Sequence, residues 1–410
     1  MQFKPSSMRL AVLLGLAQYI HSTPLHAHSQ RQTFDLTTAT LEDIASHALG
    51  VATSRLSSGS STCTSENVRV RKSFESLTDD EKIAYTGALN CLMTTPARTP
   101  SDLVPGAKSR YDDFVATHIN QTEVIHLNAA FLGWHRWYIW EMESALRDEC
   151  GYTGPFPYWD WVKTEQEGFA NSAMFDGSET SMSGNGLQVN YTTEPEIVLY
   201  PNTTGEIRIP GGPGGGCVTE GPFANMTVNL GPVQLSTPDG GTAVSPSGDN
   251  FAYNPRCLKR ALNDYALHRY VNTTSLLSLL RNTSDVWWFE DLFSGTQGVP
   301  EMGAHAGGHF AFGGDPGMDF YVSPGEPAFF VHHTNVDRVW WMWQMLDPDV
   351  RGANVETAVN GPITMWDVFE PHGNGTISTM QNLGYVKEGA EVPLGELMST
   401  TEGLFCYVYE

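Results

Sequence analysis

Basic residues are scarce in this chain. Its 410 residues include 23 lysines and arginines against 46 aspartates and glutamates, which gives a formal net charge of −23. Nucleic acids and anionic membranes are bound through basic faces, so this balance argues against both classes of partner. The 17% charged and 40% hydrophobic residues are ordinary for a globular chain that is long enough to bury a sizeable core.

Long hydrophobic runs are also missing. The best candidate, residues 10–20, is too short to cross a bilayer but suits the core of a signal peptide after a short basic start. We expect residues 1–27 to be a signal peptide and the protein to be secreted, with no membrane partner. A buried N-terminal helix is less favoured, because Pro5 precedes the run and Pro24 follows it.

The six cysteines contain no CxxC motif, so a cysteine zinc site is not expected. In an oxidising compartment three disulfides are the default, although the sequence alone does not choose the pairing. The pairing that we predict is Cys63–Cys406, Cys91–Cys150 and Cys217–Cys257. The first of these bonds would tie the two ends of the mature chain together.

Asn-x-Ser/Thr sequons suit surface loops of a secreted glycoprotein. We expect Asn120 to be buried, because it lies inside a histidine-rich stretch. The other sequons are at Asn190, Asn202, Asn225, Asn272, Asn282 and Asn374.

One change of composition divides the chain, and no repeat of solenoid period is present. Residues 165–255 are rich in Gly, Pro, Ser, Thr and Asn, which is typical of a long loop-rich insertion rather than a second core. Thr78 and Glu81 form a capping box at the start of one helix. We predict a mainly α-helical fold with a single domain over residues 28–410. The helical patterns cover residues 41–49, 76–93, 109–119, 130–148, 256–270, 274–281, 302–310 and 332–346.

Seven histidines form two groups along the sequence. His305 and His309 are one helical turn apart, so both imidazoles lie on one face and can share a metal ion. Neighbouring helix positions are ~100° apart, so only one of His332 and His333 should point at that ion. The remaining group is His118, His126 and His135.

The spacing within the first group predicts a loop. On one continuous helix His126 and His135 would face opposite sides, so we expect His126 on a loop that bends back over the helix of His135. His118 would come from the preceding helix. Each group would then supply three imidazoles from two or three elements.

Copper fits these groups better than other metals. Neither group has a carboxylate at ligand spacing, and the chain has no HExxH motif, which disfavours a di-iron or a hydrolytic zinc site. A single histidine is more often an ordinary core or surface residue, which is our interpretation of His47, His268 and His372. Two separate groups are much harder to explain in that way. We therefore predict copper ions as cofactors.

The residues around the histidines resemble a known family. Residues 126–137 (HLNAAFLGWHRW) resemble the first copper motif of the tyrosinase, catechol oxidase and hemocyanin group. Residues 305–309 (HAGGH) and 323–340 (SPGEPAFFVHHTNVDRVW) resemble the second, and residues 157–161 (PYWDW) match a further family motif. The resemblance runs from about Val70 to Tyr409 and is closest to short secreted fungal tyrosinase-like enzymes.

This resemblance implies a four-helix bundle with two coppers, and it implies a type 3 copper polyphenol oxidase that oxidises small phenols with O2. His332 would be a neighbour that is not a ligand, and Phe329 resembles the aromatic residue that packs over the copper pair. The implied ligands are His118, His126 and His135 for copper A, and His305, His309 and His333 for copper B.

The resemblance also covers the end of the domain. Asp337, one turn after His333, could orient a ring or form a structural ion pair with an arginine such as Arg71. Tyr407 and Tyr409 resemble the tyrosine motif that closes the domain in this family. The chain stops soon after them, so we expect no C-terminal extension over the site.

Two departures from the family bear on activity. Several tyrosinases hold a base-forming water with a glutamate and an asparagine that directly follows the first copper B histidine. Ala306 stands there and cannot hold a water, no glutamate is obvious in the preceding loop, and the nearest candidate, Gln297, is a neutral amide. We predict weak or absent monophenol hydroxylation, with oxidation of o-diphenols or o-aminophenols. Val124 replaces a cysteine that some relatives bond to a copper A histidine, so that thioether is not expected.

Other interpretations stay open at this point. They are a full tyrosinase with monophenolase activity, a dedicated oxidase of one secondary metabolite or peptide tyrosine, and an oxygen-binding protein. The oligomeric state is also open. The gate over copper B is expected within residues 314–323, with Met318, Phe320 and Tyr321 as candidates.

Overall fold

The structure is a computed structural model that describes residues 34–58, 62–296, 298–352 and 355–410. Residues 1–27, the predicted signal peptide, lie outside these ranges. Contacts between Cα atoms gather Leu36–Glu410 into one unit, which contains every element discussed below.

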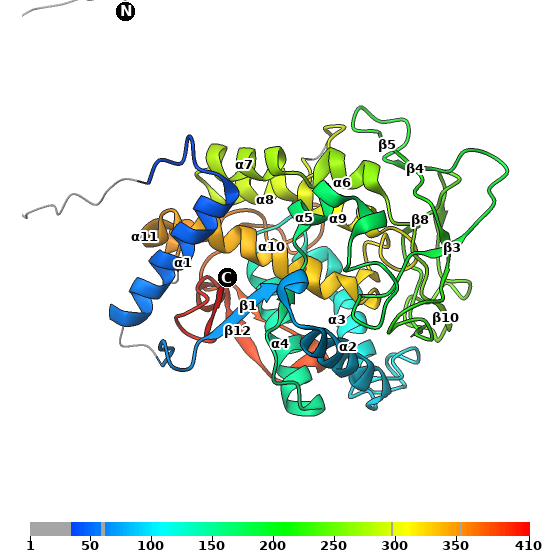
Figure 1. Ribbon diagram of the computed structural model, residues 1–410, viewed down its shortest axis with the longest axis horizontal. Helices are drawn as coiled ribbons and strands as arrows, with labels where there is room; N and C mark the ends of the chain where they lie inside the picture. The colour runs from blue at the N-terminus through cyan, green and yellow to red at the C-terminus, as the bar shows by residue number, and fades with distance from the viewer. Residues whose placement is uncertain (1–33, 59–61, 297, 353–354) are drawn as a thin grey trace, which may run out of the picture. The chain divides into compact units, whose positions relative to one another are not determined.

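Helices dominate the described chain, so the prediction of a mainly α fold is confirmed (Figure 1). Thr78 and Glu81 form the predicted capping box at the start of α2. The longer helices are α1 (Leu41–Ser58), α2 (Asp79–Thr94), α3 (Arg110–Ile125), α4 (Phe131–Cys150) and α10 (Ala328–Met345). The shorter ones are α5 (Trp161–Glu167), α6 (Asp264–Tyr270), α7 (Thr273–Asn282), α8 (Val286–Ser294), α9 (Ala304–Phe312) and α11 (Pro348–Arg351).

The predicted ranges start one of these helices too early and omit three of them, α5, α8 and α11. The helix expected over 256–270 begins only at Asp264, because Asn263 is extended and its side chain accepts the N–H of Ala266 as an N-cap. Helix α8 was not predicted at all. It has nine residues, fewer than the roughly 11 over which a helical period is recognised in a sequence.

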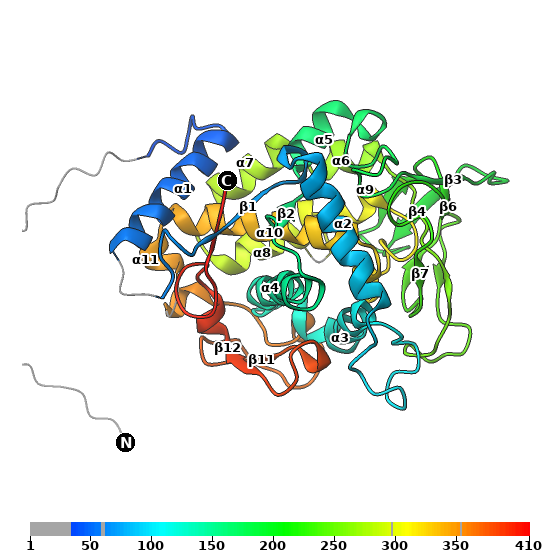
Figure 2. The same ribbon diagram turned by 60° about the horizontal axis from the view of Figure 1, so that its bottom comes forward.

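Helix α10 runs through the middle of the helical region in both ribbon views (Figures 1 and 2). It packs against α4 on one side and against α9 on the other, while α3 packs against α2 and α4. Helices α3, α4, α9 and α10 therefore form a chain of contacts. A regular four-helix bundle stays a prediction.

A buried ion network joins these helices to a small sheet. Strand β1 (Arg69–Ser73) pairs in parallel with β2 (Pro157–Tyr158) and with β13 (Tyr407–Tyr409). Asp337 on α10 accepts hydrogen bonds from Arg136 Nε at 2.6 Å, from Tyr407 OH at 2.6 Å and from Tyr409 OH. Arg71 Nη1 lies 3.4 Å from the same carboxylate. Asp337 thus plays the structural role, and its four partners are arginines and tyrosines rather than a histidine ring.

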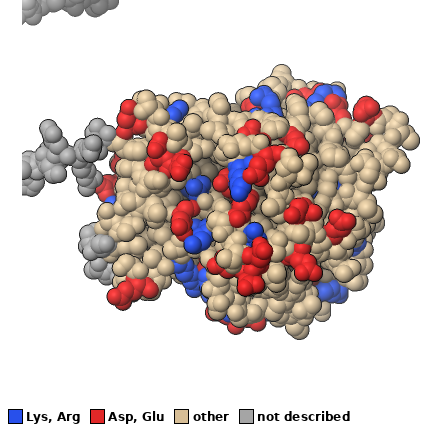
Figure 3. All heavy atoms as spheres, in the orientation of Figure 1, with Lys and Arg blue, Asp and Glu red and all other residues tan. Residues whose placement is uncertain are grey.

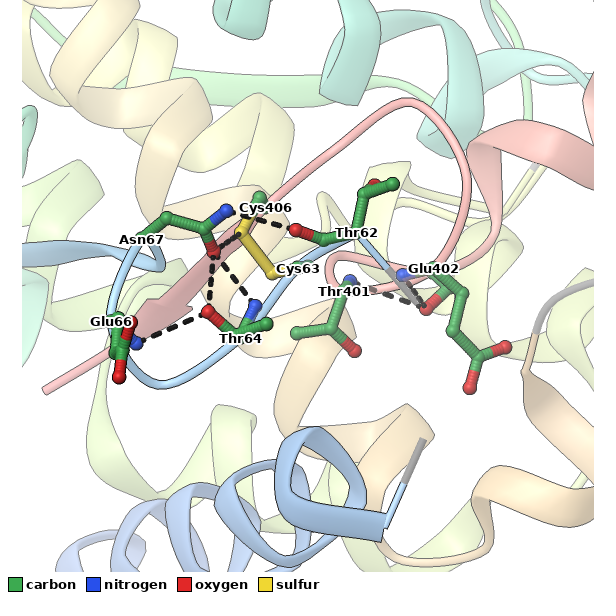
Figure 4. The surroundings of a disulfide bond; sticks show 9 residues. Thr62, Cys63, Thr64, Glu66, Asn67, Thr401, Glu402 and Cys406 are labelled. Carbon is green, nitrogen blue, oxygen red and sulfur yellow. Dashed lines mark hydrogen bonds between the residues drawn. A yellow bond between two sulfur atoms is a disulfide. The ribbon is translucent and has the colours of Figure 1, made fainter. Parts of the chain in front are cut away.

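The three predicted disulfides are all confirmed: Cys63–Cys406, Cys91–Cys150 and Cys217–Cys257. Figure 4 shows the first, which joins the segment before β1 to the segment before β13. Beside it, Asn67 Oδ1 accepts the backbone N–H of Thr64 at 2.7 Å and Asn67 Nδ2 donates to the carbonyl of Thr62 at 2.8 Å. This turn holds Cys63 opposite its partner.

The predicted loop-rich insertion is built from short antiparallel pairs. Its strands lie together to the right of the helices in both ribbon views (Figures 1 and 2). The pairs are β3 (Gly186–Gln188) with β6 (Gly215–Val218), β4 (Glu196–Leu199) with β5 (Ile207–Pro210), β7 (Thr227–Val228) with β10 (Arg256–Cys257), and β8 (Leu235–Ser236) with β9 (Thr242–Ala243). A further pair, β11 (Met380–Asn382) with β12 (Glu391–Pro393), follows α11.

Three expectations from the sequence concern the surface: its charge, the burial of Asn120 and the lack of a membrane-spanning helix. Acidic and basic side chains are mixed over the face drawn in Figure 3 rather than gathered in one patch. Asn120, which we expected to be buried, is exposed, because it lies on the outward side of α3 near its C-terminal end. Within the described ranges, no helix has the length and apolar character that crossing a membrane requires.

Candidate metal centre

Seven histidines meet in two groups in the helical core. Within each group the candidate ligand nitrogens lie within 4.8 Å of one another. All of these side chains are buried except that of His309, which is half-buried. The groups are His118, His126 and His135, and His305, His309, His332 and His333.

The first group is assembled from two helices and the loop between them. His118 lies on α3, His135 lies on α4, and His126 is the extended residue that ends α3. This is the arrangement that the spacing predicted. The loop is held by hydrogen bonds to more distant segments, including Trp366 N–H to the carbonyl of Leu127 at 3.1 Å.

Backbone carbonyls fix one nitrogen of each ring in this group. The Nδ1 atoms of His118, His126 and His135 lie 2.8, 2.9 and 2.8 Å from the carbonyls of Tyr321, Thr122 and Phe131. A carbonyl can only accept, so each Nδ1 carries the proton and each Nε2 presents a lone pair. The Nε2 atoms of His118 and His135 are buried and have no hydrogen-bond partner among the described residues. Metal-binding histidines usually show this pattern.

The packing of α9 explains the residues of its HAGGH motif, residues 305–309. His305 and His309 share one face, and Ala306, one position further round, lies half-buried on the side that reaches solvent. A Cβ atom on Gly307 would lie 2.4 Å from Tyr270 Cβ, and one on Gly308 would lie 2.1 Å from Cε1 of His332. The two glycines therefore let α9 approach its neighbours closely enough to bring its histidines to those of α10.

The two neighbouring histidines of α10 have different surroundings. His333 Nε2 lies 3.2 Å from His309 Nε2, a separation that two nitrogens bound to one ion at about 2 Å would have. His332 Nε2 lies 3.0 Å from the carbonyl oxygen of His305, so this nitrogen is already used. His332 belongs to the group by distance, and its Nδ1 is buried without a hydrogen-bond partner among the described residues. That His332 is not a ligand stays a prediction.

Burial keeps these imidazoles neutral. Loss of hydration lowers the pKa of His126 to about 4 and that of His309 to about 3, and it lowers the pKa of the other five rings well below the ordinary value. Only a neutral imidazole offers a lone pair to a metal ion. The groups are thus ready to bind a metal at neutral pH without first releasing protons.

Aromatic rings hold the two groups against each other. His135 and His333 stack with ring centroids 4.7 Å apart, which brings one ring of each group into contact. Phe329 stacks on His333 at 4.0 Å and meets His118 edge-on at 5.6 Å. Phe131 lies 4.6 Å from His305. Phe329 therefore lies against both groups, as the resemblance implied.

Helix α8, which the sequence does not predict, contacts the loop after His126 and the ring of His305. Glu290 is buried and its Oε1 accepts the backbone N–H of Asn128, two residues after His126, at 3.1 Å. Burial raises the pKa of this carboxyl well above its ordinary value. At the end of the helix, Ser294 Oγ lies 3.4 Å from His305 Nδ1. The acidic pair Glu290–Asp291 inside an apolar run was the one available signal.

Comparisons with known proteins agree with this geometry. Residues 108–346 match the family model described as the common central domain of tyrosinase. Tyrosinase P of Aspergillus terreus is 41% identical over 344 residues, which cover 83% of this chain and 91% of that protein. The chain belongs to the tyrosinase family.

Two further tyrosinase-family proteins are similar over most of their length. N-acetyl-6-hydroxytryptophan oxidase ivoB of Emericella nidulans is 38% identical over 361 residues, covering 85% of this chain and 94% of that protein. The structure of a mutant polyphenol oxidase from Thermothelomyces thermophila is 41% identical, with a TM-score of 0.80 over 90% of this chain and 97% of that one. This chain is therefore a type 3 copper oxidase, and the prediction of an enzyme is confirmed.

A binuclear copper centre is the cofactor of the tyrosinase family, which confirms the prediction of two coppers. The histidines fit it chemically. Each group offers neutral imidazoles, and buried ring nitrogens without a partner are found in both groups. Copper suits imidazole ligands, and neither group contains a carboxylate.

The residues expected to control monophenol chemistry lie as follows. Ala306 is half-buried on the outward side of α9, and Gln297 is outside the described residues. The loop before α9 does contain a glutamate, which the sequence analysis overlooked. That residue, Glu301, is exposed and forms an ion pair with Arg269. Val124 is also exposed, and all six cysteines are in disulfides, so none is left for a thioether.

Of the three gate candidates, the structure favours Phe320. Its half-exposed ring lies 4.7 Å from the ring of His126. Tyr321 instead donates its hydroxyl to Glu123 at 3.1 Å. Met318 is buried and lines a small pocket together with Phe310 of α9.

Proposed function

We propose that this protein uses O2 to oxidise o-diphenols or o-aminophenols to o-quinones or quinone imines, with weak or absent hydroxylation of monophenols. The observation that carries this proposal is the outward side of α9 beside His305. There Ala306 offers no polar atom, and the loop glutamate Glu301 is paired with Arg269 away from the histidines. No group described at this position can take a proton from a phenol.

The proton argument separates the two substrate classes. A phenol hydroxyl with a pKa near 10, as in tyrosine, is about 0.1% ionised at neutral pH, so its hydroxylation benefits from a positioned base. An o-diphenol offers two adjacent oxygens and only has to lose two electrons and two protons. It therefore depends less on a base supplied by the protein.

The proposed copper A ligands are Nε2 of His118, His126 and His135, because their Nδ1 atoms bond to backbone carbonyls. When bound, the copper pair supplies the two-electron exchange between O2 and the phenol. The proposed copper B ligands are His305, His309 and His333.

The remaining residues shape the approach of the substrate. Phe329 stacks on His333 and keeps water from the space between the two histidine groups. Phe320 lies against His126 at the exposed side and narrows the entry. Both are apolar, which suits an aromatic ring. The two protons that an o-diphenol loses are consumed when O2 is reduced to water, so the balance needs no protein base.

A dedicated oxidase of one secondary metabolite is the second candidate. The relative from Emericella nidulans, 38% identical, is named for N-acetyl-6-hydroxytryptophan. Its substrate is a hydroxylated aromatic ring with a large substituent. A substrate of that kind for the present chain would give fast turnover of one compound and slow turnover of simple catechols.

Secretion of a domain over residues 28–410, after removal of a signal peptide, is also part of the proposal. Three disulfides are typical of an oxidising compartment. Six of the seven sequon asparagines are exposed, which makes them accessible to glycosylation. The mass and N-terminal sequence of the protein secreted by an expressing host would test this.

Oxygen uptake by the copper-loaded protein tests the catalytic proposal. Catechol, o-aminophenol and tyramine are compared at equal concentrations, with the Ala306→Asn variant beside the wild type. We expect uptake with the first two substrates, little with tyramine, and a higher tyramine-to-catechol ratio in the variant. Tyramine uptake as fast as catechol uptake in the wild type would show that a base is present and would overturn the proposal.

A further inference from the structure

A small apolar pocket lies between α9 and the loop-rich insertion. Phe310 of α9 and Met318 of the gate segment border it on the side of the helical core. The insertion supplies the opposite wall through Ile197 of β4 and Ile209 of β5, both buried. The pocket has room for little more than a group of one or two water molecules in size.

Two residues that border the pocket, Phe310 and Met318, lie close in the sequence to residues at the entry to the histidines. Phe310 lies one helical turn, about 6 Å, beyond Ala306 on the same half-exposed side of α9. Met318 is two residues before Phe320, whose ring touches His126. Two separate elements that border the entry therefore also border the pocket. One turn of helix is about the length of a benzene ring with one substituent.

The amide side chain and the backbone N–H of Asn263, which lines the pocket, are already engaged. Asn263 Nδ2 donates to the carbonyl of Pro210 at 2.7 Å, and its Oδ1 accepts the N–H of Ala266 at 3.3 Å. The backbone N–H of Asn263 donates to the carbonyl of Ala311 at 2.7 Å. A group that enters the pocket thus meets mainly hydrocarbon, which favours an apolar group over a charged or hydrogen-bonding one.

We propose that this pocket is a specificity site for a short apolar substituent on the ring of the phenolic substrate, opposite the oxidised oxygens. The inference rests on the proposed function, because it assumes a phenol between the two histidine groups. It assigns a role to the insertion, whose β4–β5 pair selects among substituted catechols. Ala261, half-exposed at the pocket wall, is the position at which added bulk would fill it.

The test compares kcat/KM for 4-ethylcatechol with kcat/KM for catechol in each variant. An alkyl group also changes the reactivity of the ring itself, so the change of this ratio between variants is the measurement. We expect Ala261→Leu to lower the ratio roughly tenfold, the effect of losing a hydrophobic contact with a small alkyl group. Met318→Ala should enlarge the pocket and shift preference from 4-ethylcatechol toward 4-tert-butylcatechol.

Ala170→Leu is the matched control, since it adds the same three carbons at an exposed position of the same insertion. It should leave the ratio unchanged. Bound copper and the unfolding midpoint show whether each variant is folded. If Ala261→Leu does not fold, the substrate preference of Met318→Ala tests the inference. Wild-type ratios in both pocket variants would overturn the inference and leave the proposed function intact. No oxygen uptake by the wild type with any catechol would instead contradict the proposed function.

Discussion

Replacing Gly308 by alanine should weaken both the fold and copper binding, although alanine is the better helix former. Its Cβ would lie 2.1 Å from Cε1 and 2.6 Å from Nδ1 of His332, whereas ordinary contacts begin at 3.4 Å. The ring would have to move by more than 1 Å. It is fully buried, with Trp161 5.2 Å away on one side and the His305 carbonyl 3.0 Å away on another.

The expected magnitude follows from three contributions. Overpacking a core costs about 1–3 kcal/mol. A buried hydrogen bond that is lost, here from His332 to the His305 carbonyl, costs about 1–3 kcal/mol. The change from glycine to alanine inside a helix returns about 1 kcal/mol. Together these contributions lower the free energy of unfolding by about 1–5 kcal/mol.

The assay is urea unfolding of the metal-free protein, together with copper analysis of the loaded protein. Because the displaced ring pushes on the carbonyl of His305, copper occupancy should also fall below two ions per chain. Gly87→Ala is the matched control. Gly87 lies inside α2, and its added Cβ would meet nothing within 4 Å, so this variant should be up to about 1 kcal/mol more stable. Equal stability of the two variants, with full copper in both, would refute the packing argument for α9.

Three further predictions concern the surroundings of the histidines. Glu290→Ala leaves the buried N–H of Asn128 without an acceptor, so it should lower the free energy of unfolding by about 1–3 kcal/mol and lower copper A occupancy. The control Glu290→Gln keeps an acceptor oxygen and should keep its copper. Equal copper loss in both variants would contradict this role. Asp337→Asn leaves Arg71 and Arg136 without their shared counter-charge, so the free energy of unfolding measured in urea should fall by about 3–5 kcal/mol. Asp349→Asn, at an exposed ion pair, should lower it by under about 1 kcal/mol. Similar values for the two variants would refute the stabilising role of the buried ion network. Burial lowers the pKa of His126 to about 4 and that of His309 to about 3 in the folded protein, below the unfolded value of 6.5. The unfolded state therefore binds more protons below pH 6.5, so the free energy of unfolding should fall as pH drops from 6.5 toward 4. Urea unfolding of the metal-free protein at several pH values measures that slope, and stability that rises as pH drops from 6.5 to 4.5 would contradict this prediction.

Local patterns in the sequence predicted the parts of the site that depend on nearby residues. The spacing of His305 and His309 on one turn, and the loop that carries His126, follow from helix geometry alone. The capping box of Thr78 and Glu81 is likewise a short-range pattern. The family resemblance added the assignment of the two histidine groups to one centre, which spacing could not supply.

Contacts between segments far apart in the chain could not be predicted from the sequence. Glu301, in the loop before α9, pairs with Arg269 on α6. Glu290 meets Asn128 across 162 positions of the chain. The sequence predicted a loop-rich insertion, but not that its strands β4 and β5 would border a pocket beside Phe310. Each of these depends on tertiary packing that no local pattern encodes.

The central claim is that six histidines, in two groups of three, hold the copper pair. Anomalous diffraction at the copper edge from crystals of the loaded protein tests it most directly. We predict two peaks, one within bonding distance of the Nε2 atoms of the histidine group on α3 and α4, the other bound by His305, His309 and His333. A single peak, or a copper bound to His332 in place of His333, would contradict the account.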